Sequence, residues 1–187
     1  MTVADLECFT VDVRVDERTL RELYLAPFES LVVDGGVWMV MAAYNGVNGT
    51  TMTDNLLLTD PLVAQWGFDG VVVSDWYAAR STVASALAGL GLVMPGPAGP
   101  WGEALVDAVR DGSVPADTVA DKAARMLRLA GRVGALAEEP AGAAEEWSGE
   151  SATQLLRGAA AEAMVYLTAA VLTFLGAVAI FPVKKVK

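Results

Sequence analysis

The sequence predicts an α/β fold, an incomplete (β/α)8 TIM-type barrel of parallel βα units followed by a helical linker and a hydrophobic tail. Short apolar runs alternate with helix-forming stretches through the middle of the chain, which favours parallel strands joined by crossover helices. The repeat is about 30 residues, the size of one βα unit. Three strands can be placed, or four with residues 9–15. The chain therefore holds at most half of a barrel, which takes ~250 residues when complete.

The first predicted elements are a strand, a long helix and a second strand. Residues 9–15 alternate apolar and polar side chains, as a strand does. Asp16 is the expected N-cap of a helix over residues 17–33, which Pro27 should kink or split. Residues 37–44 form an unbroken apolar run, which predicts a strand covered on both faces.

The remaining elements follow the same alternation. The Asn and Gly residues of segment 45–50 predict a tight turn with left-handed backbone. The clearest strand is 71–75, which has three valines and ends in a carboxylate. We expect a third strand at 89–94, and helices at 59–66, 82–88, 103–111 and 117–133.

Composition excludes several classes of function. The net charge is −10, and without the three lysines at 184, 185 and 187 it would be −13. Nucleic-acid binding normally shows a basic patch, so we expect no nucleic-acid partner. The chain has no histidine, which excludes Ser-His-Asp and Cys-His catalysis and every His-ligated metal site. With one cysteine, Cys8, it has no cysteine cluster for a metal. Any chemistry must come from carboxylates, hydroxyls or amines, and the sequence assigns no metal and no organic cofactor.

The sequence predicts a boundary between two parts of the chain at residue 137. Residues 1–137 carry the βα units, and residues 138–187 contain a linker, a helix at about 150–165 and an apolar stretch at 163–183. Two interpretations of that stretch stay open, a degraded linker with the first strand of a following domain, or a transmembrane helix, since a span needs ~20 apolar residues. The N-terminus has no secretory signal pattern, so we expect a cytoplasmic protein, with anchoring to a membrane by the tail as the alternative.

Asp75 is the candidate for chemistry. Active sites of (β/α)8 barrels lie at the carboxyl ends of the strands, and Asp75 is the one carboxylate that directly ends a strong apolar strand. Trp76 stands directly after it. Met41 could form the floor of the pocket. The alternatives are a helix cap for Asp75, packing for Trp76 and Tyr44, and core filling for Met41.

Four stretches of the chain resemble glycoside hydrolase family 3, the β-glucosidase and β-xylosidase type. They are DERTLRELYLAPFE (16–29), VMAAYNGVNG (40–49), WGFDGVVVSDW (66–76) and AGLGLVMPGP (88–97). The resemblance covers roughly residues 5–165, and the WGFDGVVVSDW run in its order after MAAYNGVNG is the most specific part. The tail resembles the family more loosely, as an interdomain linker at 165–175 and the first strand of the sandwich domain at 177–182.

The resemblance implies a retaining glycosidase with a (β/α)8 barrel followed by an α/β sandwich domain. Asp75 matches the family's catalytic nucleophile, and Trp76 and Tyr44 match positions that line the subsite for the non-reducing sugar. The substrate class implied is a β-linked glycoside or oligosaccharide. The acid/base glutamate of such enzymes generally comes from beyond the first domain, and no residue of this chain is assigned to it.

This sequence departs from the family pattern at several positions. It has no counterpart of the Lys-His pair that contacts the sugar. Gly91 and Val93 stand where the family usually has Asp and Glu, and Tyr77 stands where a small residue is usual, which can crowd the pocket.

Two functional hypotheses follow. The first is a truncated β-glucosidase-like enzyme that acts by double displacement and is possibly inactive as an isolated chain. The alternative is a non-catalytic barrel remnant, membrane-associated through residues 163–183. Open sheet edges of an incomplete barrel would favour self-association in either case.

Overall fold

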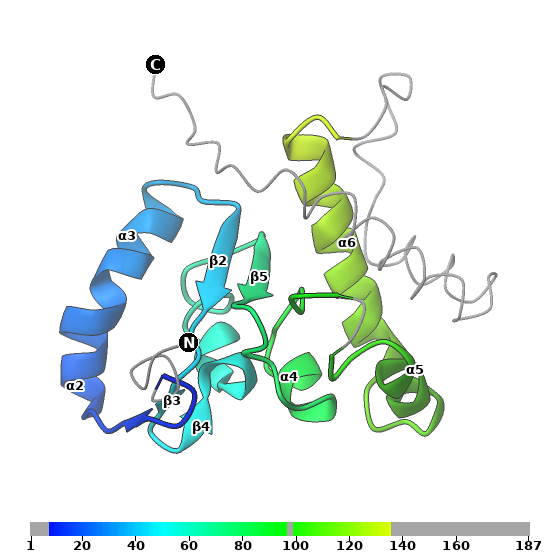
Figure 1. Cartoon of the computed structure of the whole chain (residues 1–187). Coiled ribbons are helices and arrows are strands. Elements are labelled where there is room, and N and C mark those ends of the chain that lie inside the picture. Colours follow the sequence, from blue (N-terminus) through cyan, green and yellow to red (C-terminus); the bar gives the residue numbers. More distant parts are fainter. Residues whose placement is uncertain (1–7, 97–98, 136–187) are drawn as a thin grey trace.

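The computed structural model describes residues 8–96 and 99–135. These residues form short parallel strands flanked by helices (Figure 1). The elements in chain order are β1 (Asp12–Val13), α2 (Glu17–Thr19), η1 (Leu20–Leu25), α3 (Ala26–Val33), β2 (Met39–Ala42), β3 (Gly46–Val47), β4 (Thr50–Thr51), η2 (Met52–Asp54), η3 (Leu56–Leu58), β5 (Val71–Ser74), α4 (Val83–Leu87), α5 (Glu103–Arg110) and α6 (Ala116–Arg132). The predicted linker, helix and tail beyond residue 137 lie outside the described residues.

The central pair of strands confirms the predicted parallel arrangement. β2 and β5 pair in parallel, with Met39 opposite Val71 and Ala42 opposite Ser74. The predicted third strand at 89–94 lies on the other side of β5, but it is reduced to one parallel bridge between Val73 and Leu92. The described residues thus show an α/β fold with three adjacent parallel segments.

Residues 9–15 do not form a fourth strand of this series, so that part of the prediction is wrong. Only β1 is extended, and it pairs in parallel with β3 in a separate sheet of order β1-β3-β4. The physical reason is that the 45–51 segment forms a β3-β4 hairpin, which binds the backbone of β1. Its turn uses Asn48 at φ 52° and Gly49 at φ 96°, as the Asn-Gly composition predicted.

The helix predicted at 17–33 is present but changes type along its length. Asp16 caps it as predicted, because its Oδ1 accepts a hydrogen bond from the Thr19 backbone N–H at 3.0 Å. η1 is a π-helical segment, and α3 follows with Pro27 in its first turn. The break predicted at Pro27 is therefore a switch of helix type. Of the whole run only Val32 is buried; the exposed large apolar side chains are Leu23, Tyr24, Phe28, Leu31 and Val33.

The helix predicted at 59–66 is wrong. The structure has the short 3-10 helices η2 and η3 before it, and only turns over these residues. Val63 and Gln65 donate four residues back, but Ala64 and Trp66 donate five residues back, so no regular ladder forms. By contrast, β5 and the helices predicted at 82–88, 103–111 and 117–133 are confirmed as β5, α4, α5 and α6.

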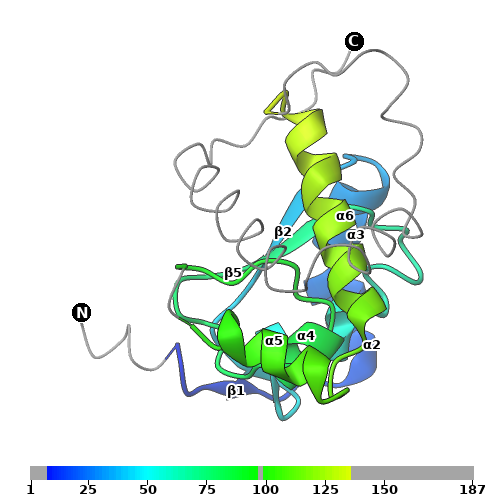
Figure 2. The same ribbon diagram turned by 90° about the vertical axis from the view of Figure 1, so that its right-hand side faces the viewer.

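Side chains on the two faces of the β2–β5 pair enter different clusters. Val40, Ala42 and Val72 pack with buried groups such as Leu58, Phe68 and Leu90. On the other face, Met39 and Val71 pack against Met126 and Leu129 of α6. Figure 2 turns α6 toward the viewer and shows α4 and α5 near one end of it.

On that second face, α6 covers only part of the β2–β5 pair. α6 contacts the amino-terminal half of the strands, so Met41 is left 56% exposed. The prediction that the 37–44 strand is covered on both faces is therefore wrong at this position. None of the described helices is long and apolar enough to cross a membrane.

Three arginines of α6 hold the chain just before β5. Arg125 donates to the carbonyl oxygens of Phe68 at 3.0 Å and Gly70 at 3.3 Å. Arg128 donates to the Asp69 carbonyl oxygen at 2.9 Å, and Arg132 binds the Asp69 carboxylate. The amino end of β5 is thereby fixed to a helix that follows it by more than 40 residues.

Candidate active site

Tyr44 and Asp75 meet at the carboxyl edge of the β2–β5 pair. Asp75 follows β5 directly, and Tyr44 follows β2 by two residues. Parallel pairing places both strand ends at one edge, and the Asp75 backbone N–H donates to the Ala42 carbonyl oxygen at 3.2 Å. The chain thus brings together two of the four residues predicted from the sequence.

The Asp75 carboxylate is half-buried and hydrogen-bonded. Its Oδ1 accepts from the Trp76 backbone N–H at 2.7 Å. Its backbone carbonyl accepts from the Ala78 N–H at 3.1 Å, which closes a turn beyond the strand. The turn and the hydrogen bond from Trp76 therefore fix the orientation of the Asp75 side chain.

The phenol of Tyr44 interacts with this carboxylate. Burial raises the pKa of Tyr44, and the hydrogen bond to Asp75 and the negative charge of Asp75 raise it further. Tyr44 is therefore protonated at neutral pH and donates to the Asp75 carboxylate. Tyr44 is therefore a hydrogen-bonding partner of the Asp75 side chain, and its contact with a sugar stays a prediction.

Two residues that sequence reasoning missed support Tyr44. The Phe9 ring lies 4.4 Å from the Tyr44 ring, centroid to centroid. Arg80 donates to the Tyr44 carbonyl oxygen at 3.2 Å, and its guanidinium carbon lies 5.4 Å from the Phe9 ring centroid. Arg80 could have been suspected as a cation shortly after the nucleophile, but nothing in the strand-like alternation of residues 9–15 singles out Phe9.

Trp76 and Met41 are both exposed at this edge. Trp76 follows Asp75 and is 56% exposed, and Met41 lies opposite Val73 in the strand register. Neither is a core residue, so the packing and core-filling alternatives do not describe them. Their contact with a sugar stays a prediction.

The neighbouring turn contains an unusual backbone conformation. Tyr77 has φ +61°, in the left-handed region that favours glycine. Its N–H donates to the Met94 carbonyl oxygen at 2.9 Å. The Ser74 hydroxyl lies within 2.8 Å of the Met94 N–H and accepts from it. These two bonds tie the end of β5 to the end of the adjacent 89–94 segment.

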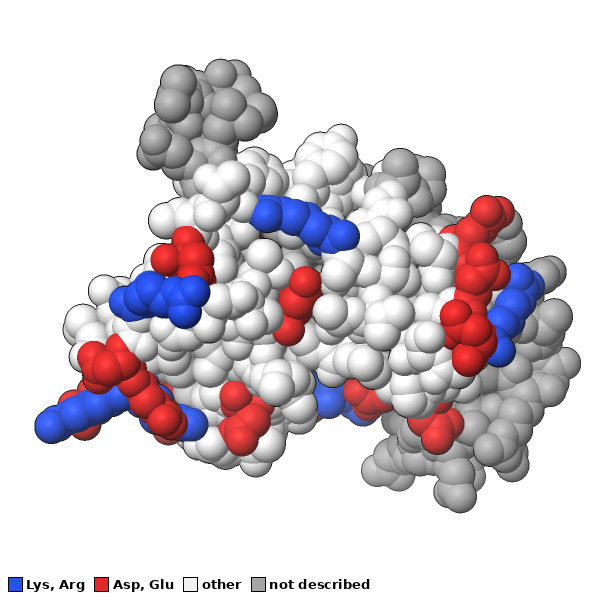
Figure 3. All heavy atoms as spheres, turned by 90° about the horizontal axis from the view of Figure 1, so that it is seen from below, with Lys and Arg blue, Asp and Glu red and all other residues white. Residues whose placement is uncertain are grey.

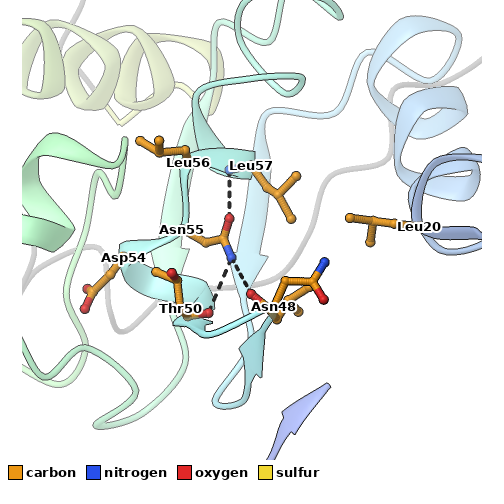
Figure 4. A pocket seen from close by; sticks show the side chains of 8 residues that line it. Leu20, Asn48, Thr50, Asp54, Asn55, Leu56 and Leu57 are labelled. Carbon is orange, nitrogen blue, oxygen red and sulfur yellow. Dashed lines mark hydrogen bonds between the residues drawn. The ribbon is translucent and has the colours of Figure 1, made fainter. Parts of the chain in front are cut away.

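The hollow shown in Figure 4 lies elsewhere and contains none of the four predicted residues. It has a volume of about 440 Å³ and is lined by Leu20, Val47, Asn48, Thr50, Asp54, Asn55, Leu56 and Leu57. Asn55 donates to the carbonyl oxygens of Val47 and Thr50 and accepts from the Leu57 N–H (Figure 4). Its polar atoms are thus engaged by backbone, and it acts as a brace for the loop.

Charged side chains are scattered over the face of the molecule seen in Figure 3. The arrowheads of β2 and β5 point toward the side from which Figure 3 is seen (Figure 1). That view shows separate acidic and basic side chains on a mainly uncharged surface, and no broad patch of one sign. Within residues 8–96 and 99–135, no group of three or more acidic or cysteine side chains could hold a metal ion.

Comparison with known proteins gives one consistent family. The model of the glycosyl hydrolase family 3 N-terminal domain matches residues 4–129. A β-glucosidase of Rhizobium radiobacter is 51% identical over 138 residues, and thermostable β-glucosidase B of Acetivibrio thermocellus is 40% identical over 159 residues. These alignments cover 73% and 84% of this chain, but only 17% and 20% of the relatives.

Solved structures agree. A β-glucosidase from Bifidobacterium adolescentis superposes with a TM-score of 0.66 at 35% identity, over 70% of this chain and 19% of that one. A β-glucosidase from Streptomyces venezuelae, solved with D-glucose, gives a TM-score of 0.65 at 37% identity, over 73% of this chain and 19% of that one. The chain therefore spans about a fifth of the length of the proteins that it resembles.

Proposed function

Because the chain belongs to glycoside hydrolase family 3, we propose that it is part of a retaining β-glucosidase in which Asp75 is the nucleophile. The observation that carries the proposal is the Asp75 carboxylate at the carboxyl edge of parallel strands, hydrogen-bonded by Trp76 N–H and by Tyr44. The related β-glucosidase from Streptomyces venezuelae was solved in complex with D-glucose, which supports a β-glucoside as the substrate.

The proposed reaction is a double displacement. An oxygen of the Asp75 carboxylate attacks the anomeric carbon, and the bond to the leaving oxygen breaks as an acid/base carboxyl protonates it. Water then attacks the same carbon and releases both the sugar and Asp75. The two carboxyl groups of a retaining enzyme lie ~5–5.5 Å apart, and we assign the second to no residue of this chain.

Tyr44 has a defined part in this reaction. Its hydroxyl donates to the attacking carboxylate in the free site, which fixes the direction of one oxygen lone pair. When Asp75 becomes an ester, its negative charge disappears and that hydrogen bond weakens. Trp76 and Met41, both exposed at the edge, would contact the apolar side of the sugar.

The incomplete barrel and the domain boundary belong to the same proposal. We infer that residues 1–137 form the carboxyl-terminal part of a (β/α)8 barrel domain, and that 138–187 continue toward a following domain. β2 pairs only with β5 among the described residues, which leaves its other edge available to further strands.

A mechanism-based label tests the nucleophile. A 2-deoxy-2-fluoroglucoside with a good leaving group should leave a fluoroglucosyl ester on the peptide that contains Asp75, detected by mass spectrometry. Asp75→Asn should abolish the label. Asp69→Asn, which changes a carboxylate at the opposite end of the same strand, should retain it. A label on another carboxylate, or no label on the complete enzyme, would reject the assignment.

The second candidate function is a non-catalytic remnant that associates with itself. The large apolar side chains exposed on η1 and α3 favour it, as does the single neighbour of β2. Turnover of an aryl β-glucoside by the purified 187-residue chain would reject the remnant. Sedimentation of a strict monomer at micromolar concentration would reject the self-association.

A further inference from the structure

The backbone of Tyr77 adopts a conformation that a tyrosine ordinarily avoids. Residues 75–78 form a turn closed by the hydrogen bond from Ala78 N–H to the Asp75 carbonyl at 3.1 Å. Tyr77 is the third residue of this turn and has φ +61°. A turn with positive φ at its third residue usually has glycine or asparagine there. The chain therefore places a bulky residue where its backbone is strained.

No contact of the Tyr77 ring that the structure shows offsets this backbone strain. The Tyr77 side chain is 66% exposed. In the part of the chain that the structure describes, its side chain makes neither a hydrogen bond nor a ring contact. Ala78 and Ala79, which follow, are buried. A strained residue that gains no packing is a candidate for a functional role.

The turn fixes where this ring stands. It begins at Asp75, and the Tyr77 N–H donates to the Met94 carbonyl oxygen at 2.9 Å. Tyr77 therefore lies at the rim between the ends of β5 and the 89–94 segment, two residues from the candidate nucleophile, and its side chain is exposed. Trp76 is exposed beside it. A tyrosine at such a rim offers an aromatic face and edge to a ring and a hydroxyl to a polar group.

We propose that Tyr77 is a specificity-determining residue that contacts the ring of the leaving group, so that glycosides with a ring-shaped aglycone react better than those without one. The proposal deepens the function proposed above and rests on it. Asp75 makes the bond to the sugar, whereas Tyr77 touches only the departing part of the substrate.

Labelling with two reagents distinguishes contacts to the sugar from contacts to the leaving group. One is the 2-deoxy-2-fluoroglucoside with a dinitrophenyl leaving group, and the other is 2-deoxy-2-fluoroglucosyl fluoride, which has no ring to contact. Tyr77→Ala should slow labelling by the first about 2- to 10-fold, the usual strength of an aromatic pair. It should leave the second within about twofold. Tyr77→Phe keeps the ring and should behave as the wild type with both.

An equal loss with both reagents would mean that Tyr77 merely supports the site, and would overturn the proposal while the assignment of Asp75 stands. Absence of any label in the complete wild-type enzyme would instead count against Asp75. A binding experiment then decides on Tyr77 without chemistry. Phenyl 1-thio-β-glucoside should bind more tightly than methyl 1-thio-β-glucoside, and Tyr77→Ala should remove that preference. No preference in the wild type overturns the proposal.

A pair of variants tests the strain itself. Tyr77→Ala and Tyr77→Gly both lack the ring, but only glycine accepts φ +61° without penalty. The unfolding constant of Tyr77→Gly should therefore be about fivefold to tenfold smaller than that of Tyr77→Ala. Equal constants would remove the premise that the turn is strained.

Discussion

Lys122 provides a sharp test of how the α6 interface is stabilised. Its side chain is buried on α6, at 8% exposure, with Nζ 5.9 Å from the centroid of the Trp101 ring. Burial lowers the pKa of Lys122 from 10.5 to about 8, the neighbouring charge of Asp121 raises it slightly, and Arg125 lowers it further. The folded protein therefore binds this proton less tightly than the unfolded chain does.

The cost of the buried charge follows from that difference. The pKa of Lys122 falls from 10.5 to about 8, and at 1.36 kcal/mol per pKa unit the cost of burying the charge is roughly 3 kcal/mol. Below pH 8 the lysine is charged in both states, and the full cost is present. Between about pH 8 and 10.5 it is neutral only in the folded protein, so stability rises with pH. Above 10.5 the cost is gone.

Lys122→Met removes the charge and keeps most of the volume. We expect the variant to be ~2 kcal/mol more stable than the wild type at pH 7, after a loss of ~0.5–1 kcal/mol of cation–π attraction to Trp101. This advantage should shrink to nothing by pH 10.5. Urea denaturation followed by circular dichroism from pH 6 to 11 measures it.

Arg18→Met is the matched control. Arg18 has an 82% exposed side chain in an ion pair with Glu22, so its loss should change stability by less than about 0.5 kcal/mol. The change should not vary from pH 8 to 10.5, because arginine stays charged. A constant difference between wild type and Lys122→Met over that range would refute the reasoning.

Two further predictions concern the amino end of β5. Gly70→Ala should prevent stable folding, because its Cβ would lie 2.2 Å from the carbonyl oxygen of the residue before β2, whereas Gly96→Ala, with nothing within 4 Å, should keep the wild-type melting temperature. Asp69→Asn should cost at most ~1 kcal/mol by urea denaturation at pH 7, because this half-exposed carboxylate is partly screened by water. The hydrogen bond from Arg132 holds the pKa of Asp69 below its usual value, so its contribution is complete above about pH 4. It should decrease in denaturation curves as the pH falls further, and a cost that does not decrease with falling pH would contradict the assigned ion pair.

Local patterns in the sequence predicted the regular elements well where the pattern itself decides the structure. The valine run 71–73 lies in β5, and the stretch predicted as a helix at 117–133 is α6. Asp16 caps the first helix as its side-chain chemistry requires. These features depend on residues close in sequence, so a pattern reveals them.

The failures arise where distant contacts decide. Residues 9–15 alternate like a strand of the main sheet, but the backbone of the 45–51 hairpin donates to the carbonyl oxygens of Val11 and Val13, and only Asp12–Val13 form a strand there. Met41 lies in an apolar run, yet its exposure depends on where α6 ends along the sheet. The periodicity of apolar residues along the sequence predicts neither the pairing of residues 9–15 nor the exposure of Met41.

The candidate site shows the same division. Asp75 could be singled out because it ends a strong strand, and the resemblance added Tyr44 and Trp76. The support of Tyr44 by Phe9 and Arg80 joins segments far apart in the chain, so no local signal reveals it. The left-handed backbone of Tyr77 contradicts the preference of its residue type, and only coordinates could show it.

The contacts of Arg125, Arg128 and Arg132 with residues 68–70 have a consequence for evolution and for protein engineering. They fix the amino end of β5 to α6, so a substitution around residue 69 should disturb the strand and the helix together. A library of new specificities would therefore leave residues 68–70 unchanged and randomise the exposed Trp76 and Tyr77, while it keeps Asp75 and the buried Ala78 and Ala79.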